Sequence, residues 1–448
     1  MLTQILATVL LIVVDGLRPD YVTPQQMPRL FELGQRGIVF NAHHSVFPTV
    51  TRVNGSTFVT GTYPETHGLL GNTIYVPAVS ATKTLDTGDR ENLVAVANTG
   101  PLLTTPTLGE ILRRAGKRFA VFSSATTGAT FILDQSAPAR ELPPHAIPNA
   151  AQHTRVVDAY LSDPSQDVAI LWLSDPDSTA HQKGIGSPAT RESLRIVDAE
   201  IGRIEDTLRA NGQLTKTDII VTSDHGFTTH NSHLRLEEVV KPLARTLADG
   251  STDIVVAEGA IYFRGAADRA RVAGVVAALQ ARPPVGAIFT RDGAIPGTLP
   301  YDLIRWNHPR SGDILVSANW NTEKNEFGYE GITTQTGTAG HGSSSPYDIH
   351  NTLIAVGPDF REHATSDAPT GNADIAPTIL RAIGMTPLQT MTGRIIEEMF
   401  RTGPLPSSLA VTRTTNTVKN ADGSYELTAH ISTVAGSRYL DWTETRRK

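Results

Sequence analysis

The sequence predicts an α/β fold in which a mostly parallel central sheet is covered by helices on both faces. Two observations predict it. Short apolar runs alternate with amphipathic segments along most of the chain, which is the pattern of a helix-covered parallel sheet. Several of these apolar runs end at an aspartate or a histidine, and open α/β sheets bind ligands beyond such strand ends. The length of 448 residues suits one large domain with an insertion, or two domains.

The first apolar run, residues 8–14, is predicted to be a buried parallel strand. It could instead be the apolar part of a signal peptide, but the residues around it include neither a basic region nor a small-residue cleavage site. The run continues directly into Asp15 and Gly16 and is too short to span a bilayer. An export signal outside this sequence stays an alternative. Similar apolar runs predict further strands at 119–124, 167–173, 218–223 and 350–357.

The amphipathic segments between these runs predict helices. The longest covers residues 190–212, and Gly212 is suited to the cap at its end. Its apolar residues recur close to every third and fourth position: Leu194, Ile196, Val197, Ile201, Ile204 and Leu208. Further helices are predicted at 27–37, 105–116, 153–163 and, as the closing helix of the same sheet, 372–385.

The composition of the sequence changes between residues 230 and 335, which are rich in proline, glycine and turn signals. Because a core strand is predicted again at 350, we interpret this segment as an inserted lobe. The catalytic core would then be discontinuous, comprising residues 1–229 and 336–400. Residues 401–448 show strand-like alternation around a turn and are predicted to be a strand-rich extension of the core.

Composition excludes some classes of function. The chain has no cysteine, which excludes disulfides, thiolate metal ligands and a cysteine nucleophile. Its net charge of -6 argues against non-specific nucleic-acid binding. An acidic protein can still bind a phosphate ester where metal ions supply positive charge locally. The sequence does not indicate an oligomeric state.

The polar residues at the strand ends form a possible metal site. They are Asp15, Asp177, His181, Asp224, His225 and His341. Asp177 and His181 are four residues apart and can share a helical face. Three carboxylates and three imidazoles are what two closely spaced zinc ions need. Each residue alone could be a turn aspartate, a helix cap or a loop histidine, but their joint position at strand ends favours a metal site.

Five motifs, in order from about residue 10 to 385, carry a resemblance to a known family. They are "VVDGLRPDY", "FPTVTRVNGSTFVTGTYPETHGLLGN", "DPDSTAHQKG", "VTSDHGF" and "AGHGSSSPYDIHNTLIAVGPDF". Together they resemble the nucleotide pyrophosphatase/phosphodiesterase branch of the alkaline phosphatase superfamily. The resemblance implies an alkaline-phosphatase-like three-layer sandwich with two Zn²⁺ ions. It also implies a small phosphate-ester substrate, nucleotide-type esters first among them, and a periplasmic or secreted location.

The resemblance also implies roles for individual residues. Thr51 would be the nucleophile, would form a covalent phospho-threonine, and would stand near a helix N-terminus, which favours anions. Asn72 would bind phosphate, and Thr49 would support the nucleophile. One zinc site would comprise Asp177, His181 and His341, and the other Asp15, Asp224, His225 and the Thr51 oxygen.

Arg52 departs from the family pattern, which has an aromatic residue directly after the nucleophile. It is either a solvated charge or a cation that binds phosphate oxygens. The second interpretation raises the alternative of a phosphomonoesterase with the same fold. Monoesterases of the superfamily use lysine or arginine from a segment that corresponds to residues 121–133, which contain neither. A binding protein without catalysis is a third hypothesis, although every ligand position is filled.

Overall fold

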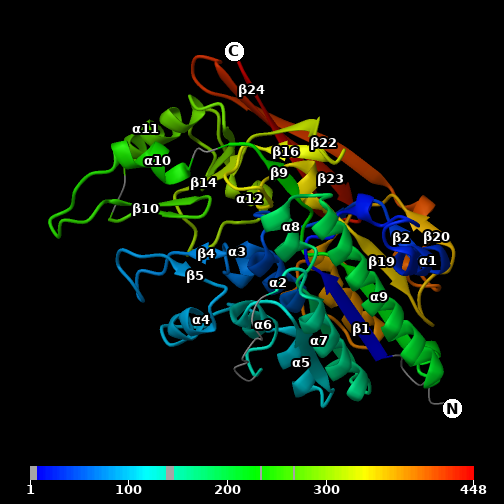
Figure 1. Ribbon diagram of the computed structural model, residues 1–448. Helices are drawn as coiled ribbons and strands as arrows, with labels where there is room; N and C mark the ends of the chain where they lie inside the picture. Colours follow the sequence, from blue (N-terminus) through cyan, green and yellow to red (C-terminus); the bar gives the residue numbers. More distant parts are fainter. Residues whose placement is uncertain (1–7, 138–145, 233–234, 266–267) are drawn as a thin grey trace.

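The computed structural model describes residues 8–137, 146–232, 235–265 and 268–448 and confirms the predicted α/β fold. The first seven residues, which the signal-peptide alternative includes, lie outside this range. A seven-stranded sheet forms the core (Figure 1). In spatial order its strands are β20 (Ala364–Ser366), β2 (Ile38–Phe40), β19 (Leu353–Val356), β8 (Thr217–Thr222), β1 (Thr8–Val14), β7 (Val168–Leu173) and β6 (Phe119–Ser123).

Strands β8, β1, β7 and β6 are parallel neighbours, whereas β19 runs antiparallel to both β8 and β2. The predicted strand at 350–357 is divided in two. Residues 353–356 form β19, but β18 (His350–Asn351) leaves the central sheet and pairs with β3 (His43–His44). The antiparallel strand and the division follow from these long-range pairings, which local sequence does not reveal.

Alternate residues of β1 show why both faces of the sheet are covered. Val9, Leu11 and Val13 join one hydrophobic cluster, and the intervening apolar residues of β1 join another. Helices α2 (Thr51–Thr60), α5 (Leu108–Arg114), α6 (Thr127–Leu133) and α14 (Ile375–Ala382) cover the first face. Helices α1 (Pro28–Arg36), α7 (Ala150–Ser162) and α9 (Pro188–Ala210) cover the second. The continuous apolar run is therefore buried on both sides, as in parallel sheets.

The inserted segment forms its own sheet, in the spatial order β10 (Ile254–Ala257), β11 (Ala260–Phe263), β14 (Ile314–Ala318), β12 (Val285–Thr290) and β13 (Leu299–Pro300). Helices α10 (Leu236–Val240) and α11 (Arg269–Gln280) pack on it. We call this part the lobe; it lies at the upper left of Figure 1, in green. Beside it, β15 (Trp320–Lys324), β16 (Glu330–Thr333), β9 (Thr228–His230) and β17 (Ala339–Gly340) form a four-stranded sheet.

The C-terminal residues form a three-stranded antiparallel sheet of β22 (Val411–Lys419), β23 (Tyr425–Val434) and β24 (Ser437–Arg447). Tyr425, Leu427 and Ala429 are buried in the same hydrophobic cluster as the lobe strands. The C-terminal sheet therefore packs on the lobe as well as on the core. Within the described ranges, no helix has the length and apolar character needed to cross a membrane.

Candidate active site

The strand-end residues that the sequence singled out come together at one edge of the central sheet. Because β8, β1 and β7 are adjacent and parallel, their carboxyl ends meet there. Asp15 follows β1, Asp224 and His225 follow β8, and Asp177 begins α8 (Asp177–Lys183) after β7. The loop after β17 adds His341.

The first ligand set comprises Asp177, His181 and His341. The Oδ1 atom of Asp177 lies 3.2 Å from His181 Nε2 and 3.3 Å from His341 Nε2. His181 Nδ1 donates a hydrogen bond to the carbonyl of Ala339 at 3.0 Å, and His341 Nδ1 donates to that of Thr49 at 2.9 Å. These bonds fix the tautomers, so that both Nε2 lone pairs face the same carboxylate oxygen, as in metal sites with supported histidine ligands.

The second ligand set comprises Asp15, Asp224 and His225. His225 Nε2 lies 3.1 Å from Asp224 Oδ2 and 3.5 Å from Asp15 Oδ1. The indole N–H of Trp172 donates to Asp15 Oδ2 at 3.0 Å, which leaves Oδ1 toward the centre of the site. Sequence reasoning did not single out Trp172, because a tryptophan inside an apolar strand gives no sign of its indole partner.

The two sets adjoin each other, since the rings of His225 and His341 stack with centroids 3.5 Å apart. Three carboxylate oxygens close to these rings are buried and have no hydrogen-bond partner in the described part of the chain: Asp15 Oδ1, Asp177 Oδ1 and Asp224 Oδ2. Unpaired buried acceptors of this kind are costly unless a cation satisfies them. The nitrogen and oxygen donors fit a divalent metal such as zinc.

The electrostatics of the site agree with that requirement. Burial raises the pKa of Asp15 well above its ordinary value, and the charges of Asp224 and Asp177 raise it further. Burial acts in the same direction on Asp177, but the neighbouring His181 and His341 outweigh it and hold its pKa well below the usual range. Burial lowers the pKa of His341 to about 4, so that its imidazole is neutral and able to act as a ligand. Bound cations would relieve the repulsion among the carboxylates.

Thr51 is the first residue of α2, and its hydroxyl lies 3.3 Å from His225 Nε2. Val50 precedes it in an extended conformation and offers no side-chain cap. Backbone N–H groups in the first turn of α2 can therefore favour an anion beside the hydroxyl. The structure places Thr51 where the sequence expected it, in contact with the second ligand set.

Thr49 has a different environment. Its hydroxyl donates to the carbonyl of Ser343 at 2.7 Å and accepts from the N–H of Gly342 at 3.1 Å. These bonds join the loop before Thr51 to the loop that carries His341. Thr49 is thus occupied as a support, which leaves Thr51 as the hydroxyl that faces the ligand sets.

Asn72 adjoins the same helix start. Its Oδ1 accepts from the backbone N–H of Arg52 at 3.0 Å, which orients the amide group beside Thr51. Its own backbone N–H donates to Glu258 Oε2 at 2.7 Å. Glu258 has a φ of 57° in the tight turn between β10 and β11, so the tip of a lobe hairpin holds Asn72 in place. Sequence reasoning did not single out Glu258, because the partner of its carboxylate is 186 residues away.

Comparison with known proteins gives the family. The model of the type I phosphodiesterase/nucleotide pyrophosphatase family matches residues 9–343. The chain belongs to this family. Ectonucleotide pyrophosphatase/phosphodiesterase family member 7 of Homo sapiens is 28% identical over 223 residues, which are 49% of this chain and 48% of that protein. Bis(5'-adenosyl)-triphosphatase of Homo sapiens is 25% identical over 397 residues, or 84% of this chain and 78% of that one.

The chain spans about half the length of the curated relatives that it matches most significantly. Among solved structures, murine ectonucleotide pyrophosphatase/phosphodiesterase 5, as an inactive variant in complex with AMP, aligns with a TM-score of 0.65. The alignment covers 88% of this chain and 100% of that chain at 20% sequence identity. This likeness supports the alkaline-phosphatase-like fold.

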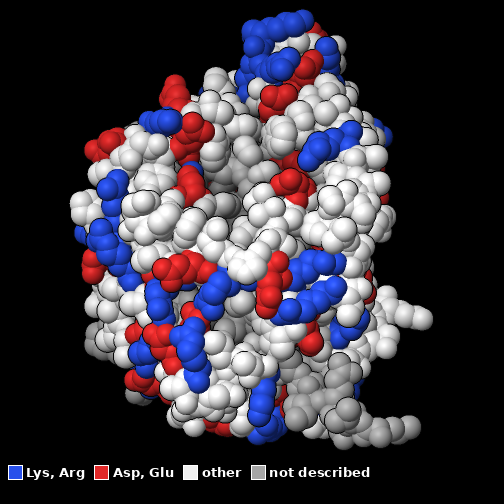
Figure 2. Space-filling model, turned by 90° about the vertical axis from the view of Figure 1, so that its right-hand side faces the viewer, with Lys and Arg blue, Asp and Glu red and all other residues white. Residues whose placement is uncertain are grey.

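Arg52, where the family pattern has an aromatic residue, is not a solvated charge. Its guanidinium lies 3.3 Å from Asp86 Oδ1, on β5 (Leu85–Asp86), and its side chain is 16% exposed. The ion pair orients the guanidinium of Arg52 toward Asp86 on β5. Figure 2 shows acidic and basic side chains interspersed over the visible face.

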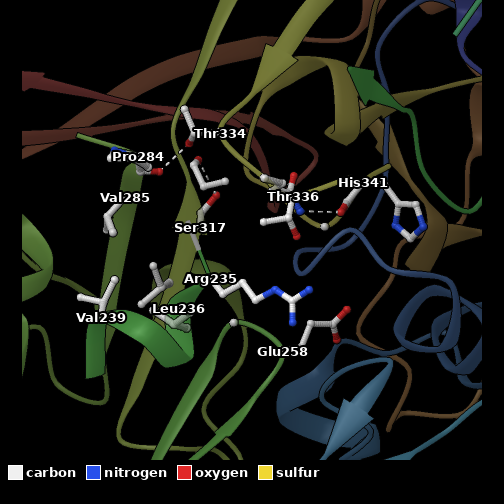
Figure 3. A pocket seen from close by; sticks show the side chains of 15 residues that line it. Arg235, Leu236, Val239, Glu258, Pro284, Val285, Ser317, Thr334, Thr336 and His341 are labelled. Carbon is white, nitrogen blue, oxygen red and sulfur yellow. Dashed lines mark hydrogen bonds between the residues drawn. The ribbon is translucent and has the colours of Figure 1, made fainter. Parts of the chain in front are cut away.

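Two cavities adjoin the site. One, of about 160 Å³, includes Thr51 and Asp177 and is otherwise lined largely by hydroxyl and amide side chains: Ser124, Thr126, Asn149, Gln152, Ser174 and Ser178. The other, of about 250 Å³, lies between His341 and the lobe (Figure 3). Arg235 and Glu258 provide charge there, and Leu236, Val239 and Val285 provide an apolar wall. A phosphate group at Thr51 would have room for a substituent in the first cavity, and the second lies beside His341.

Proposed function

We propose that this protein is a two-zinc hydrolase that cleaves phosphodiester or pyrophosphate bonds through a phospho-threonine intermediate. One observation carries the proposal: three buried carboxylate oxygens without hydrogen-bond partners face imidazole nitrogens beside the Thr51 hydroxyl. Membership of the phosphodiesterase/nucleotide pyrophosphatase family supports it. Zinc, when bound by the two ligand sets, would favour the Thr51 alkoxide and neutralise charge on the phosphoryl oxygens.

The chain's own residues then account for positioning and bond exchange. Thr51 Oγ1 attacks phosphorus, forming a P–O bond as the bond to the leaving oxygen breaks. Water afterwards attacks the same phosphorus and releases the product and the free threonine. The amide of Asn72 and the N-terminus of α2 stabilise the non-bridging oxygens, where charge develops. Thr49 keeps the nucleophile loop against the loop that carries His341.

We further propose nucleotide-type esters or anhydrides as substrates. A relative is named bis(5'-adenosyl)-triphosphatase, and the murine structure contains AMP. The cavity that includes Thr51 and the cavity beside His341 offer room for the two parts of such a molecule. The lack of lysine and arginine in residues 121–133 weighs against the phosphomonoesterase alternative, although Arg52, which pairs with Asp86, also lines the cavity that includes Thr51. The names of the ectoenzyme relatives support a location outside the cytoplasm.

Substitution of the nucleophile tests the mechanism. Thr51→Ala should abolish turnover of bis-p-nitrophenyl phosphate and of a nucleotide p-nitrophenyl ester while bound zinc is retained. Ser56→Ala is the matched control, because it removes a hydroxyl on the same helix that donates only to the Arg52 carbonyl. Mass spectrometry of acid-quenched wild type should show one added phosphoryl group on the peptide that contains Thr51. Undiminished turnover by Thr51→Ala would refute the mechanism.

A further inference from the structure

A further group of side chains that could hold a metal ion lies outside both ligand sets. It comprises His44 on β3, His350 on β18 and Asp441 on β24, which are far apart in the sequence. The antiparallel pairing of β18 with β3 places His350 opposite His44. One ligand atom from each residue lies within 4.8 Å of those from the other two. We call these three residues the strand triad, since each lies on a strand.

The hydrogen bonds of His44 leave its other nitrogen facing a carboxylate. Its Nδ1 lies 2.8 Å from the carbonyl oxygen of Thr370, which can only accept, so Nδ1 carries the proton. The Nε2 of a neutral ring then has a lone pair, yet it lies 2.8 Å from Asp441 Oδ1. Two lone pairs cannot face each other stably at that distance. Either a second proton on His44 or a bound cation must lie between them.

His350 distinguishes these two possibilities. Its Nε2 is buried and has no hydrogen-bond partner in the ranges that the structure describes. The ring stands edge-on to that of His44, with centroids 4.7 Å apart and an interplanar angle of 89°. A proton on His44 would satisfy the pair with Asp441 but leave His350 unpaired, whereas one metal ion can engage all three residues.

The neighbouring His43 shows that burial alone does not produce this arrangement. Its Nδ1 lies 2.8 Å from Thr370 Oγ1 and its Nε2 lies 2.9 Å from Asn372 Oδ1, so that both nitrogens are paired. His44 also borders a cavity of about 30 Å³, alongside Tyr439.

We propose that the strand triad binds a third divalent metal ion, of the zinc class. Two imidazole nitrogens and one carboxylate oxygen are donors that zinc prefers, whereas calcium and magnesium prefer oxygen alone. Donor atoms 2.8 Å apart can both reach an ion at the usual distance of about 2.0–2.2 Å. The ion would fasten the C-terminal sheet to β3, the strand that leads into the nucleophile loop. Its role is structural, because the triad does not touch Thr51.

Metal counting tests the proposal without relying on the catalytic sites. Protein equilibrated in buffered zinc and freed of excess should contain one more zinc ion per chain in wild type than in His350→Ala or Asp441→Asn, by plasma mass spectrometry. Activity should stay within about twofold of wild type in both variants. His430→Ala is the matched control, since it removes a histidine of the C-terminal sheet that pairs with Glu444 instead.

A second measurement covers the case in which a substitution impairs folding. In a His341→Ala background, which weakens the first ligand set, zinc should still raise the midpoint of thermal unfolding, and adding His350→Ala should reduce that rise. Equal zinc content in folded wild type and His350→Ala would overturn the proposal and leave His44 as a protonated partner of Asp441. The two tests are independent. The zinc count reports on the triad, whereas turnover by Thr51→Ala reports on the mechanism, and we expect that variant to lose activity while it retains three zinc ions.

Discussion

Glu258 allows the influence of the lobe on catalysis to be measured. Its carboxylate accepts hydrogen bonds from the backbone N–H groups of Asn72 at 2.7 Å and Thr73 at 3.4 Å. Only the first is short, and Glu258 is exposed, so that solvent screens its charge; we therefore assign about 1–2 kcal/mol to the charge-assisted bond. Glu258→Ala should therefore lower kcat/KM about 5- to 30-fold. The backbone strain at φ 57° is unchanged, since alanine meets the same restriction there.

A double-mutant cycle tests whether Glu258 acts through Asn72. Asn72→Ala alone should lower kcat/KM about 100-fold, as loss of a donor to the transition state does. In that background Glu258→Ala should have little further effect, because the two residues act in series. Glu323→Ala, at an exposed residue of β15 beside the lobe, is the control. Equal effects of Glu258→Ala in both backgrounds would show that Glu258 acts by another route, such as contact with the substrate.

Two further predictions concern metal affinity and pH. Trp172→Phe removes the indole donor to Asp15 Oδ2, so zinc affinity should fall about 10- to 100-fold in competition with a chelator; unchanged affinity would contradict the supporting role of Trp172. Burial, together with the charge of nearby Asp359, raises the pKa of Asp218 to about 7, although the hydrogen bond from the Asp359 backbone N–H acts in the opposite direction. Folding is thus favoured while Asp218 is protonated, and that contribution is lost as pH rises from about 4 through 7, up to about 2–4 kcal/mol. Urea unfolding should show Asp218→Asn gaining stability over wild type at about pH 8 but not at about pH 4; parallel pH profiles would exclude this cause.

Local sequence was enough to predict most of the central sheet and much of the site. A continuous apolar run such as residues 8–14 can be buried on two faces only in such a sheet, and the aspartate that follows it must then lie at the sheet edge. Asp177 and His181 are linked by helical spacing alone. His341, in contrast, sits in a glycine loop whose position depends on β17 and on Thr49, so local sequence could name it as a candidate but could not place it beside Asp177.

The contacts that sequence could not provide are those between distant segments. Glu258 reaches Asn72 from a hairpin turn in the lobe, and His350 reaches His44 through the pairing of two-residue strands. Neither has a periodicity that a local pattern could reveal. The packing of Tyr425 into the hydrophobic cluster of the lobe likewise depends on tertiary structure. Arg52 stood out in the sequence, yet its ion pair with Asp86 became visible only in the fold.

The position of β19 in the central sheet has a consequence for synthesis of the chain. β19 lies between β8 and β2 and is made only after the whole lobe. Until it arrives, the nascent protein carries an unpaired apolar strand edge on β8, and β2 has no neighbour on that side. Such edges invite pairing with other chains. The time needed to synthesise the lobe is therefore the time for which these strand edges stay unpaired. During that time, chaperones or early collapse of the core must protect them from aggregation.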